Sequence, residues 1–536
     1  MTPLLARPAA PALTHERSAL PPARLLAPAL AIAALAAVPV VYLVVRALGV
    51  DAAAIALIAR PRTLELFVAS VGLALTVGIG AIAIGVPLAW LTARTDLPAR
   101  RLWTIATAVP LAIPSYVMAF AFVAAVGPRG AISDLLRQAG LPGVPSVYGF
   151  AGAAIVLTLA TYPYVLLATR AALLRSDPQI EEAGRVLGDG ALTTFRRVTL
   201  PILAPAIAGG ALLAVLYALA DFGAVAILQF DSFARAIYVQ YRASFDRSLA
   251  ALLALMLVGV TFAVAWIEWR VRSRRPQIRS APRRPPRPIQ LGSWRWPAVA
   301  FCAAVTILGL VIPAATIAVW LTRGLAQGEP VRILLDSGAN SVVAGSLAAL
   351  VAAVLALPIA FLLVRHPGRL AAWIEGFVYS AYAVPGIVLA LATAFFVLNV
   401  APFMYQTMFV LVLAYAVRFL PQAIGPERTS LSQVSTGLVE AARTLGDNPA
   451  GAFRSITLPL LRPGIVAGMA LVFLTTVKEL PLTLLLGPTG FDTLATQIWG
   501  AATEGFYARA AVPAALLMLL SALTVGILFR AEEPVP

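Results

Sequence analysis

The chain has 536 residues, of which 60% are hydrophobic and only 12% are charged, and its mean hydropathy is +0.89. A soluble globule of this length cannot hide so many apolar side chains, so the composition excludes a soluble protein and predicts an integral membrane protein. The net charge of +16 comes almost wholly from arginine. Arginine-rich loops beside apolar spans are typical of topology signals and lipid-headgroup contacts, so we expect a lipid bilayer and no nucleic acid as partner.

Apolar runs of about 20 residues are long enough to cross a bilayer as helices. Twelve such runs are predicted as spans, at residues 25–48, 65–93, 103–126, 148–170, 202–229, 248–269, 298–322, 339–364, 372–400, 406–425, 460–487 and 508–530. We therefore expect an all-α polytopic membrane protein with about 12 transmembrane helices. The first run is too long for a signal-peptide core, so we expect it to remain as an anchor.

The twelve spans divide into two halves of six. We predict a cytoplasmic N-terminal segment at 1–24, a first six-helix repeat at 25–269, a second at 298–530 and a tail at 531–536. Residues 270–297 join the halves, and their arginines and prolines predict a cytoplasmic linker that neither packs nor spans. The arginine clusters fall on one side of the twelve-span pattern, which the positive-inside rule identifies as the cytoplasm. Both termini are therefore expected inside.

A polar phrase recurs in the two halves. Glu182-Ala183-Gly184 precedes Gly188, and Glu440-Ala441-Ala442 precedes Gly446 258 positions later. Prolines also repeat in pairs that lie 258 or 271 positions apart, namely Pro163 and Pro421, Pro87 and Pro358, and Pro114 and Pro385. Because each half holds an even number of spans, the two repeats are expected to be parallel in the membrane.

Helix-capping residues surround the repeated phrase. Asp177 and Ser435 are good N-cap residues, and Gly188 and Gly446 stand where a helix can end in a left-handed residue. In the second half, Asp447 is expected to cap a further short helix. A loop of about thirty residues is longer than two spans need, so we predict that each loop docks a partner. The alternative is a loop that only orders the helix ends.

This pattern resembles the EAA loop of permease subunits of ATP-binding-cassette (ABC) importers. The resemblance implies a type I ABC importer permease fold, in which a coupling helix of each loop rests on a separate ATPase subunit. It assigns the ATPase contact to the residues of the repeated phrase, Glu182, Ala183, Gly184, Gly188, Glu440, Ala441, Ala442 and Gly446. A chain with two such loops is expected to bind two copies of an ATPase subunit.

The chain is not itself expected to be the ATPase. A phosphate-binding loop needs a lysine after a glycine, and the single lysine, Lys478, follows Val477 in a predicted span. We therefore expect no enzyme activity and no cofactor in this chain, with ATP held by the partner subunits. The single cysteine, Cys302, excludes a disulfide within the chain.

Two carboxylates recur at the same predicted depth. Asp221 and Glu479 are 258 positions apart, and a charge inside the bilayer costs at least about 2.5–3.5 kcal/mol, which makes it a functional candidate. Hard cations choose oxygen ligands, so we predict that Asp221 and Glu479 are transient metal ligands in a substrate pathway, with Tyr217 nearby. The alternatives are structural: Glu479 pairs with Lys478 or an arginine, and Asp221 caps a helix broken at Gly223.

Three stretches around these carboxylates, 219–225, 477–483 and 488–496, are similar to the fused ferric-iron permeases of the same family. The likeness runs from about residue 60 to the C-terminus. It implies an inner-membrane protein that receives Fe3+ from a periplasmic solute-binding protein. That partner is expected to dock on the external loops 230–247 and 488–507, which carry the acidic residues Asp231, Asp246, Asp492 and Glu504.

Other cargoes and classes stay open at this point. A similar fused permease for thiamine, an aminoethylphosphonate or a polyamine is the first alternative. A proton-coupled secondary transporter acting through Asp221 and Glu479 is a second, but it leaves the paired loops unexplained. A channel or a membrane-embedded enzyme is disfavoured, because His15 and His366 are in or beside predicted cytoplasmic segments and no His/Glu cluster has metal-ligand spacing.

Overall fold

The computed structural model describes residues 21–48, 56, 60–128, 130–140, 146–176, 186–188, 190–243, 248–273, 288–326, 328 and 331–532. These residues form helices, and extended segments pair among them only at one bridge between Thr95 and Ile289. Eleven of the described helices are long and apolar enough to cross a membrane, or twelve if one bent pair counts as a span. The prediction of an all-α polytopic protein is therefore confirmed.

The first half contains eleven α-helices within the described residues. They are α1 (Ala23–Leu48), α3 (Pro61–Arg94), α4 (Arg100–Ala106), α5 (Ser115–Val126), α6 (Ala131–Gln138), α7 (Phe150–Arg175), α9 (Ala191–Thr194), α10 (Leu200–Ala220), α11 (Gly223–Ile227), α12 (Phe233–Ala243) and α13 (Ser248–Ser273). The longest, α3, leaves large apolar side chains exposed along one side, including Leu64, Val68, Leu75 and Ile79. In a membrane protein such a face meets lipid.

The second half repeats this order. Its helices are α14 (Arg295–Thr306), α15 (Ile312–Ala326), α16 (Val331–Arg365), α17 (Arg369–Ala383), α18 (Gly386–Val400), α19 (Met408–Gln433), α20 (Thr436–Thr444), α21 (Pro449–Ala452), α22 (Leu458–Val477), α23 (Pro481–Leu486), α24 (Leu494–Glu504) and α25 (Tyr507–Glu532). The pairs α3 and α16, α7 and α19, and α10 and α22 occupy matching places in the two halves.

Two predicted spans are not single helices. The predicted span 103–126 is divided into α4 and α5, and the predicted span 372–400 is divided into α17 and α18, which are bent by 104°. The breaks fall at Pro114 and Pro385, where Ile113 and Val384 have extended backbones. Proline lacks an N–H and disfavours helical backbone in the residue before it. The prediction of continuous helices was wrong for this reason.

Two further predicted spans end early. The predicted spans 202–229 and 460–487 stop as α10 at Ala220 and α22 at Val477, and the short helices α11 and α23 follow after a break. The residues at these breaks include the two carboxylates of interest, Asp221 and Glu479. Hydropathy alone does not reveal the breaks, because the apolar run continues on both sides of each carboxylate.

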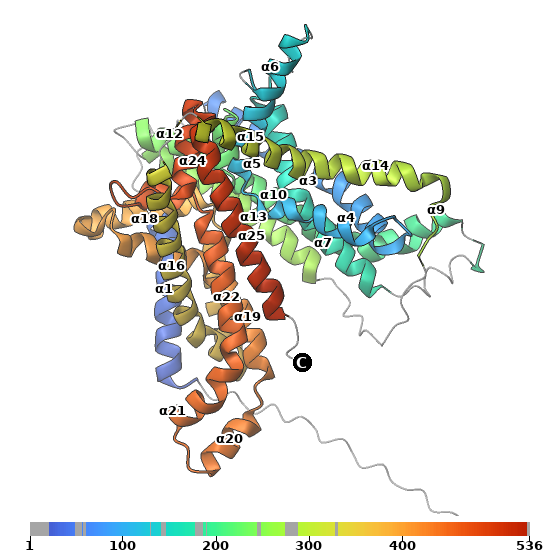
Figure 1. The fold of residues 1–536 in the computed structure, drawn as a ribbon. Helices are drawn as coiled ribbons and strands as arrows, with labels where there is room; N and C mark the ends of the chain where they lie inside the picture. Colours follow the sequence, from blue (N-terminus) through green and yellow to red (C-terminus); the bar gives the residue numbers. More distant parts are fainter. Residues whose placement is uncertain are drawn as a thin grey trace, which may run out of the picture.

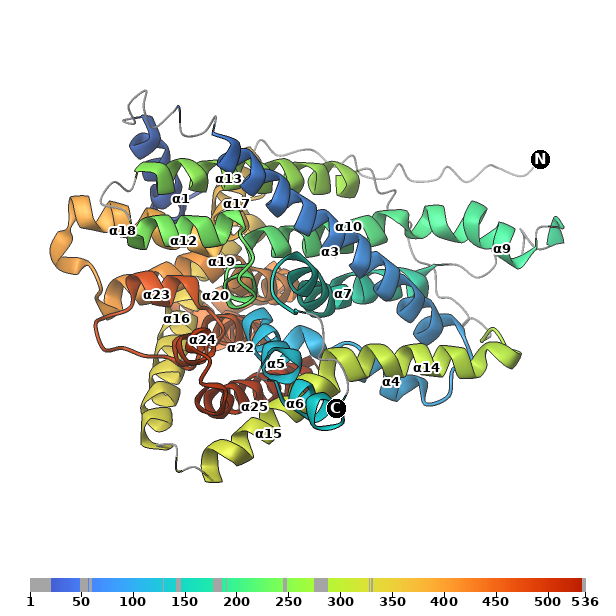
Figure 2. The same ribbon diagram turned by 90° about the horizontal axis from the view of Figure 1, so that it is seen from above.

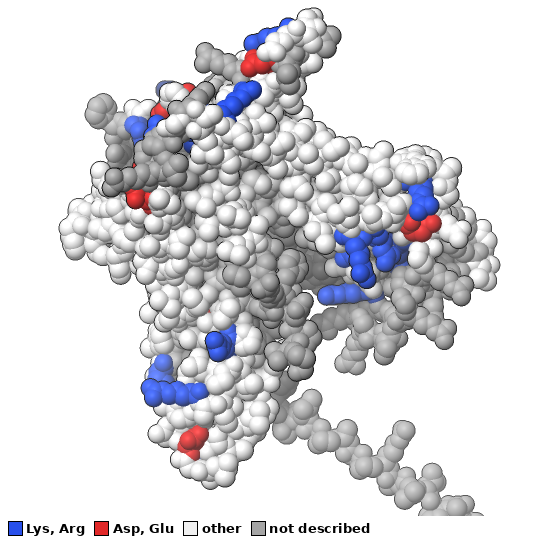
Figure 3. Space-filling view, viewed as in Figure 1, with Lys and Arg blue, Asp and Glu red and all other residues white. Residues whose placement is uncertain are grey.

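The two halves diverge from a shared end. In Figure 1 the helices α16, α19, α22 and α25 run toward α20 and α21, whereas α3, α7 and α10 run toward α9. The view in Figure 2 also places α9 at one extremity, on the side toward which α14 of the second half extends. Charged side chains gather near these ends and at the shared end in Figure 3, and a wide uncharged surface lies between them. This distribution suits a bilayer-embedded middle.

The first membrane span of each half packs against the other half. Helix α1 packs against α16, α17 and α18 of the second half, while α15 packs against α5 of the first half. Part of the predicted linker is also ordered: Ile289 exchanges backbone hydrogen bonds with Arg94 (2.8 Å) and Asp96 (3.1 Å), and α14 begins at Arg295. The prediction that 270–297 does not pack is therefore wrong for residues 288–297; residues 274–287 lie outside the described part.

Glycines allow close helix packing at matching places in the two halves. A Cβ at Gly210 of α10 would lie 2.7 Å from Cα of Val165 in α7, and a Cβ at Gly468 of α22 would lie 3.0 Å from Cα of Ala423 in α19. Small residues let membrane helices approach backbone to backbone. The same device therefore holds the corresponding helix pair together in each half.

Candidate functional site

The second polar loop forms two short helices joined by a glycine turn. The Ser435 hydroxyl accepts a hydrogen bond from the Leu438 N–H (3.3 Å) and caps α20, as predicted. The chain then turns at Gly446, whose φ of 104° favours glycine. The cap of α21 is Asn448, whose Oδ1 accepts from the Gly451 N–H at 2.7 Å. The prediction that Asp447 would cap this helix was one residue off; its carboxylate accepts from Ser455 instead.

The exposed side chains of this loop lie on and beside α20. Glu440 and Ala441 are exposed and Ala442 is buried. Leu445, directly before the glycine, is 88% exposed. Leu438 of α20 is 50% exposed, so two large apolar side chains of this loop face solvent, as on surfaces that bind a partner.

The described part of the first loop repeats two of these features. Gly188 has a φ of 93°, and Leu187 before it is 86% exposed. These residues match Gly446 and Leu445 at the 258-residue offset. The predicted contact residues Glu182, Ala183 and Gly184 lie outside the described residues, as does Asp177.

Asp221 stands at the break between α10 and α11 and is 8% exposed. Its Oδ1 accepts hydrogen bonds from the backbone N–H groups of Ala224 (2.9 Å) and Val225 (3.4 Å). The hydroxyl of Ser115, the first residue of α5, donates to Oδ2. Asp221 therefore caps the short helix α11, which is the structural alternative weighed for it.

Glu479 stands at the matching break between α22 and α23. Its Oε2 lies 3.7 Å from Nε of Arg418 in α19, and the two side chains are 11% and 14% exposed. Arg418 also donates from its Nη1 to the Val384 carbonyl at 3.2 Å. Among the described residues, Oε1 of Glu479 and Nε of Arg418 have no hydrogen-bond partner. The pair is therefore loose, with bonding capacity left on both members.

A glycine makes room for this pair. A Cβ at Gly386 would lie 2.9 Å from Oε1 of Glu479 and 3.1 Å from Cζ of Arg418. In the first half the residue at the matching place is Ser115, which bonds Asp221. Equivalent carboxylates thus have different partners: a serine hydroxyl donates a hydrogen bond to Asp221, and a guanidinium forms an ion pair with Glu479.

The two breaks lie close together across the halves. A Cβ at Gly223 would lie 2.7 Å from Cβ of Tyr116 and 3.2 Å from Cδ2 of Leu480. No hydrogen bond or ion pair joins Asp221 to Glu479 directly in the part of the chain that the structure describes. Tyr217 lies against Ser115, and its ring packs on Tyr164 with centroids 6.2 Å apart.

A polar layer lies about one helical turn from these breaks, in the direction of the polar loops. The Thr475 hydroxyl donates to Oε1 of Gln422 (2.8 Å), and Nε2 of Gln422 donates to the Tyr382 hydroxyl (3.2 Å). Thr475 and Gln422 match Tyr217 and Tyr164 of the first half at the 258-residue offset. The layer therefore draws on the same helix faces in both halves.

Sequence reasoning missed two partners at the breaks. Arg418 lies inside the predicted span 406–425, so the rule that singled out the carboxylates would also have found it. Ser115 had no such signal beyond its place after Pro114. Among the described residues, no group of three or more His, Cys, Asp or Glu side chains is arranged to hold a metal ion.

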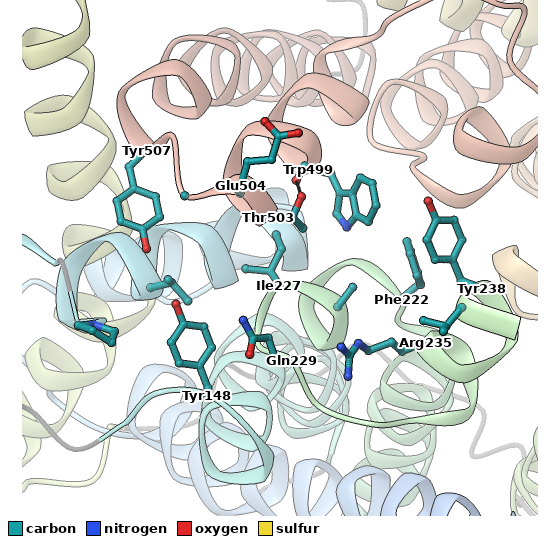
Figure 4. A pocket seen from close by; sticks show the side chains of 16 residues that line it. Tyr148, Phe222, Ile227, Gln229, Arg235, Tyr238, Trp499, Thr503, Glu504 and Tyr507 are labelled. Carbon is teal, nitrogen blue, oxygen red and sulfur yellow. Dashed lines mark hydrogen bonds between the residues drawn. The ribbon is translucent and has the colours of Figure 1, made fainter. Parts of the chain in front are cut away.

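A pocket of about 520 Å³ lies at the shared end, between the halves (Figure 4). Its polar lining comes from both halves: Gln229, Arg235 and Tyr238 from the first, and Trp499, Thr503 and Glu504 from the second. The predicted external loops therefore each contain a helix, α12 and α24, that borders the pocket. Burial raises the pKa of Tyr238, and the nearby Arg242 opposes this shift.

Three aromatic rings of the pocket lining pack together beside the break at Asp221. Phe222 follows Asp221 directly, is 2% exposed and lines the pocket. Its ring centroid lies 4.8 Å from that of Tyr238 and 5.9 Å from that of Trp499, and the latter two are 5.7 Å apart. We call Phe222, Tyr238 and Trp499 the aromatic seam. It joins the halves at the end opposite the polar loops.

Comparison with known proteins agrees with the repeated architecture. The family model of the binding-protein-dependent transport system inner membrane component matches twice, at residues 81–275 and 342–534. The Fe(3+)-transport system permease protein FbpB 2 of Haemophilus influenzae is 33% identical over 91% of this chain and 94% of its own length. The ferric transport system permease protein FbpB of Actinobacillus pleuropneumoniae is 26% identical over 75% of this chain and 62% of its own length.

Shorter similarities reach permeases named for other cargoes. The molybdenum transport system permease protein ModB of Escherichia coli is 31% identical over 26% of this chain and 60% of its own length. The two matches of the family model together cover more than half of the chain, one in each half. The chain therefore belongs to the family of binding-protein-dependent transport system inner membrane components, the permeases of ABC transporters.

Proposed function

We propose that this permease imports ferric iron across the cell inner membrane, driven by two copies of a partner ATPase. The observation that carries the cargo assignment is the 33% identity to an Fe(3+)-transport permease along 91% of the chain. The similarity includes both halves, so it is not confined to one motif. A periplasmic solute-binding protein is the donor of the iron.

The two polar loops are the ATPase-docking sites in this proposal. Support comes from the matched, solvent-held Leu187 and Leu445, and from the positive φ of Gly188 and Gly446. An ATPase groove that takes up α20 buries Leu445 with the exposed Glu440 and Ala441. ATP is bound and hydrolysed by the partners, and this chain supplies no cofactor.

The loop ends are cytoplasmic in this proposal, so the aromatic seam and the pocket above it face the periplasm. Residues 1–24, the linker 270–297 and the tail 531–536 then lie in the cytoplasm, and 25–269 and 298–530 are the two membrane repeats. The divergence of the halves toward α9 and α20 (Figure 1) supports an inward-facing state.

Transport follows from rocking the halves. ATP-driven closure of the ATPases brings the loop ends together, and the aromatic seam opens because its rings come from both halves. The pocket then receives iron from the binding protein. Glu479, which has a free carboxylate oxygen, is the pathway residue that this geometry supports. Asp221 instead holds α11 in place, and Tyr217 lies next to its partner Ser115.

The test is uptake by iron-starved cells that carry or lack this chain. Radiolabelled Fe3+, thiamine, 2-aminoethylphosphonate and spermidine are offered in parallel at limiting concentrations. We expect only Fe3+ uptake to fall in cells without the chain and to return on complementation. Loss of another solute alone, with unchanged iron uptake, would assign the permease to that solute.

A further inference from the structure

Two arginines of the first half lie together at the end that leads to its polar loop. Arg170 stands near the end of α7, and Arg100 is the first residue of α4. The Tyr162 hydroxyl of α7 donates to the carbonyl of Thr107, the C-cap of α4, at 2.6 Å. Each arginine lies about two helical turns from this contact along its own helix. Arg100 is close enough to Arg170 that the two positive charges repel each other.

The second half has a carboxylate where the first half has none. Arg428, which matches Arg170 at the 258-residue offset, has its Nη1 2.8 Å from Oε1 of Glu375 in α17. Glu375 matches Thr104 of α4 at the 271-residue offset. Within the described residues, Nε of Arg170 is buried and has no hydrogen-bond partner. The first half therefore keeps the arginine and replaces its acidic partner with a hydroxyl.

The residues around the arginine pair are those of a membrane surface. Leu102 and Ile105 of α4 are exposed apolar side chains, and residues three apart share a side of a helix. Trp294 and Trp296 are also exposed. The segment before these tryptophans is fixed to the turn between α3 and α4, because Oδ1 of Asp96 accepts one of its backbone N–H groups at 2.9 Å. Tryptophan is enriched where a bilayer meets water, so the arginines lie at the level of lipid headgroups.

We propose that Arg100 and Arg170 bind the phosphate of an anionic phospholipid in the leaflet on the side of the polar loops. Guanidinium groups match phosphate geometry, and basic pockets between membrane helices bind anionic headgroups. The acyl chains lie against Leu102 and Ile105. The lipid phosphate takes the place that the Glu375 carboxylate has in the second half. This inference does not depend on the cargo.

The experiment counts the lipids that stay bound to the full chain. The protein is purified in a mild nonionic detergent and mixed with equal amounts of phosphatidylglycerol and phosphatidylcholine that have the same acyl chains. Native mass spectrometry then identifies the retained lipids. We expect phosphatidylglycerol to be retained in preference to phosphatidylcholine. An excess of inorganic phosphate is expected to leave it bound, because free phosphate has no acyl chains to pack against α4.

Three variants give the matched comparison. The double variant Arg100→Gln with Arg170→Gln is expected to lower the affinity for phosphatidylglycerol by roughly thirtyfold, about fivefold for each basic residue at a membrane surface. Thr104→Glu supplies the carboxylate that Glu375 provides in the second half, and is expected to abolish the lipid preference while every arginine remains. Arg428→Gln removes an arginine that already has a carboxylate partner, and is expected to leave lipid retention unchanged.

Each contrary result has a separate meaning. Equal retention of the two lipids by the unchanged protein would overturn the proposal. Equal losses in Arg428→Gln and in the double variant would also overturn it, because retention would then follow total charge. Release by inorganic phosphate would show a site for a soluble anion and reject the lipid. A preserved preference in Thr104→Glu, with thermal unfolding like that of the unchanged protein, would place the lipid elsewhere.

Discussion

Equivalent carboxylates are held in different ways in the two halves. In the first half Asp221 is satisfied by a hydroxyl and two backbone N–H groups, all from rigid helix ends. In the second half Glu479 faces the long side chain of Arg418 across 3.7 Å and keeps a free oxygen. Two matching positions differ: Ser115 stands where the second half has Gly386, and Ala160 stands where it has Arg418. The first carboxylate therefore has a hydroxyl as its side-chain partner, whereas the second has a guanidinium.

The docking loops show the opposite relation. At the glycine turn the halves agree in backbone conformation and in the exposed leucine before it. Under the proposed function, the repeats are alike at the two loops that would dock two copies of one ATPase. They differ at the two carboxylates, of which only Glu479 keeps a free oxygen for the proposed pathway.

The largest effect is expected from Gly188→Asp or Gly446→Asp. A non-glycine residue at φ of 93° or 104° is strained by about 1–2 kcal/mol, and the new side chain enters the docking surface. We expect iron uptake to fall by at least about a hundredfold with either change. Copurification of the ATPase measures docking. Gly437→Ala, in the same helix α20 with only ordinary contact to Ser435, is the control. Normal uptake in either aspartate variant would remove that loop from the coupling role.

The ion pair of the second half is expected to matter next. Arg418→Met leaves the carboxylate of Glu479 buried without its counter-charge, which costs about 2–3 kcal/mol for a pair as loose as this one. Thermal unfolding of the detergent-solubilised protein measures the loss. The double variant Arg418→Met with Glu479→Gln is expected to recover most of it, and a double variant less stable than Arg418→Met would contradict the pairing.

Neutralising each carboxylate singly sharpens the comparison of the breaks. Asn at position 221 keeps an acceptor oxygen for the cap, so Asp221→Asn is expected to change iron uptake by less than about twofold. Glu479→Gln removes the charge that faces Arg418 and the cargo, and is expected to lower uptake by about tenfold, or roughly 1.4 kcal/mol. Equal losses from the two changes would show that the halves share the pathway role evenly.

The smallest effect concerns a pair of serines that the halves have in common. The hydroxyl oxygen of Ser70 accepts from the Phe233 N–H at 2.9 Å, and that of Ser341 accepts from the Leu494 N–H at 2.8 Å. Each anchors the start of an outer helix, α12 or α24. We expect Ser70→Ala and Ser341→Ala to cost about 1 kcal/mol each, with equal shifts in thermal unfolding. A clear difference between them would show that the outer helices are not held equivalently.

The sequence predicted the repeats well because they leave periodic marks. Apolar runs predict the spans, and the 258-residue offset singles out Gly188, Gly446, Asp221 and Glu479 from the sequence alone. The breaks at Pro114 and Pro385 were overlooked because hydropathy averages over the residues that interrupt a helix. The proline at each break is the local signal for it, because proline disfavours helical backbone in the residue before it.

The partners of the carboxylates were harder to predict. Arg418 and Glu479 are 61 positions apart (479 − 418), and their contact depends on how α19 packs against α22. The role of Gly386 is likewise a matter of space, since it is the absence of a side chain that admits the guanidinium. Such contacts follow from tertiary packing and carry no local pattern in the sequence.

The most direct test of the account is the distance between the two loop ends. Spin labels are placed at Arg196→Cys and Arg454→Cys, two exposed and repeat-equivalent positions beside the docking loops, in a chain whose buried Cys302 is changed to Ala. The distance is measured by pulsed electron paramagnetic resonance with the ATPase absent and with the ATPase trapped in its ATP-bound state. We predict a clear shortening in the trapped state. An unchanged distance with both ATPase copies bound would contradict transport by rocking of the two halves.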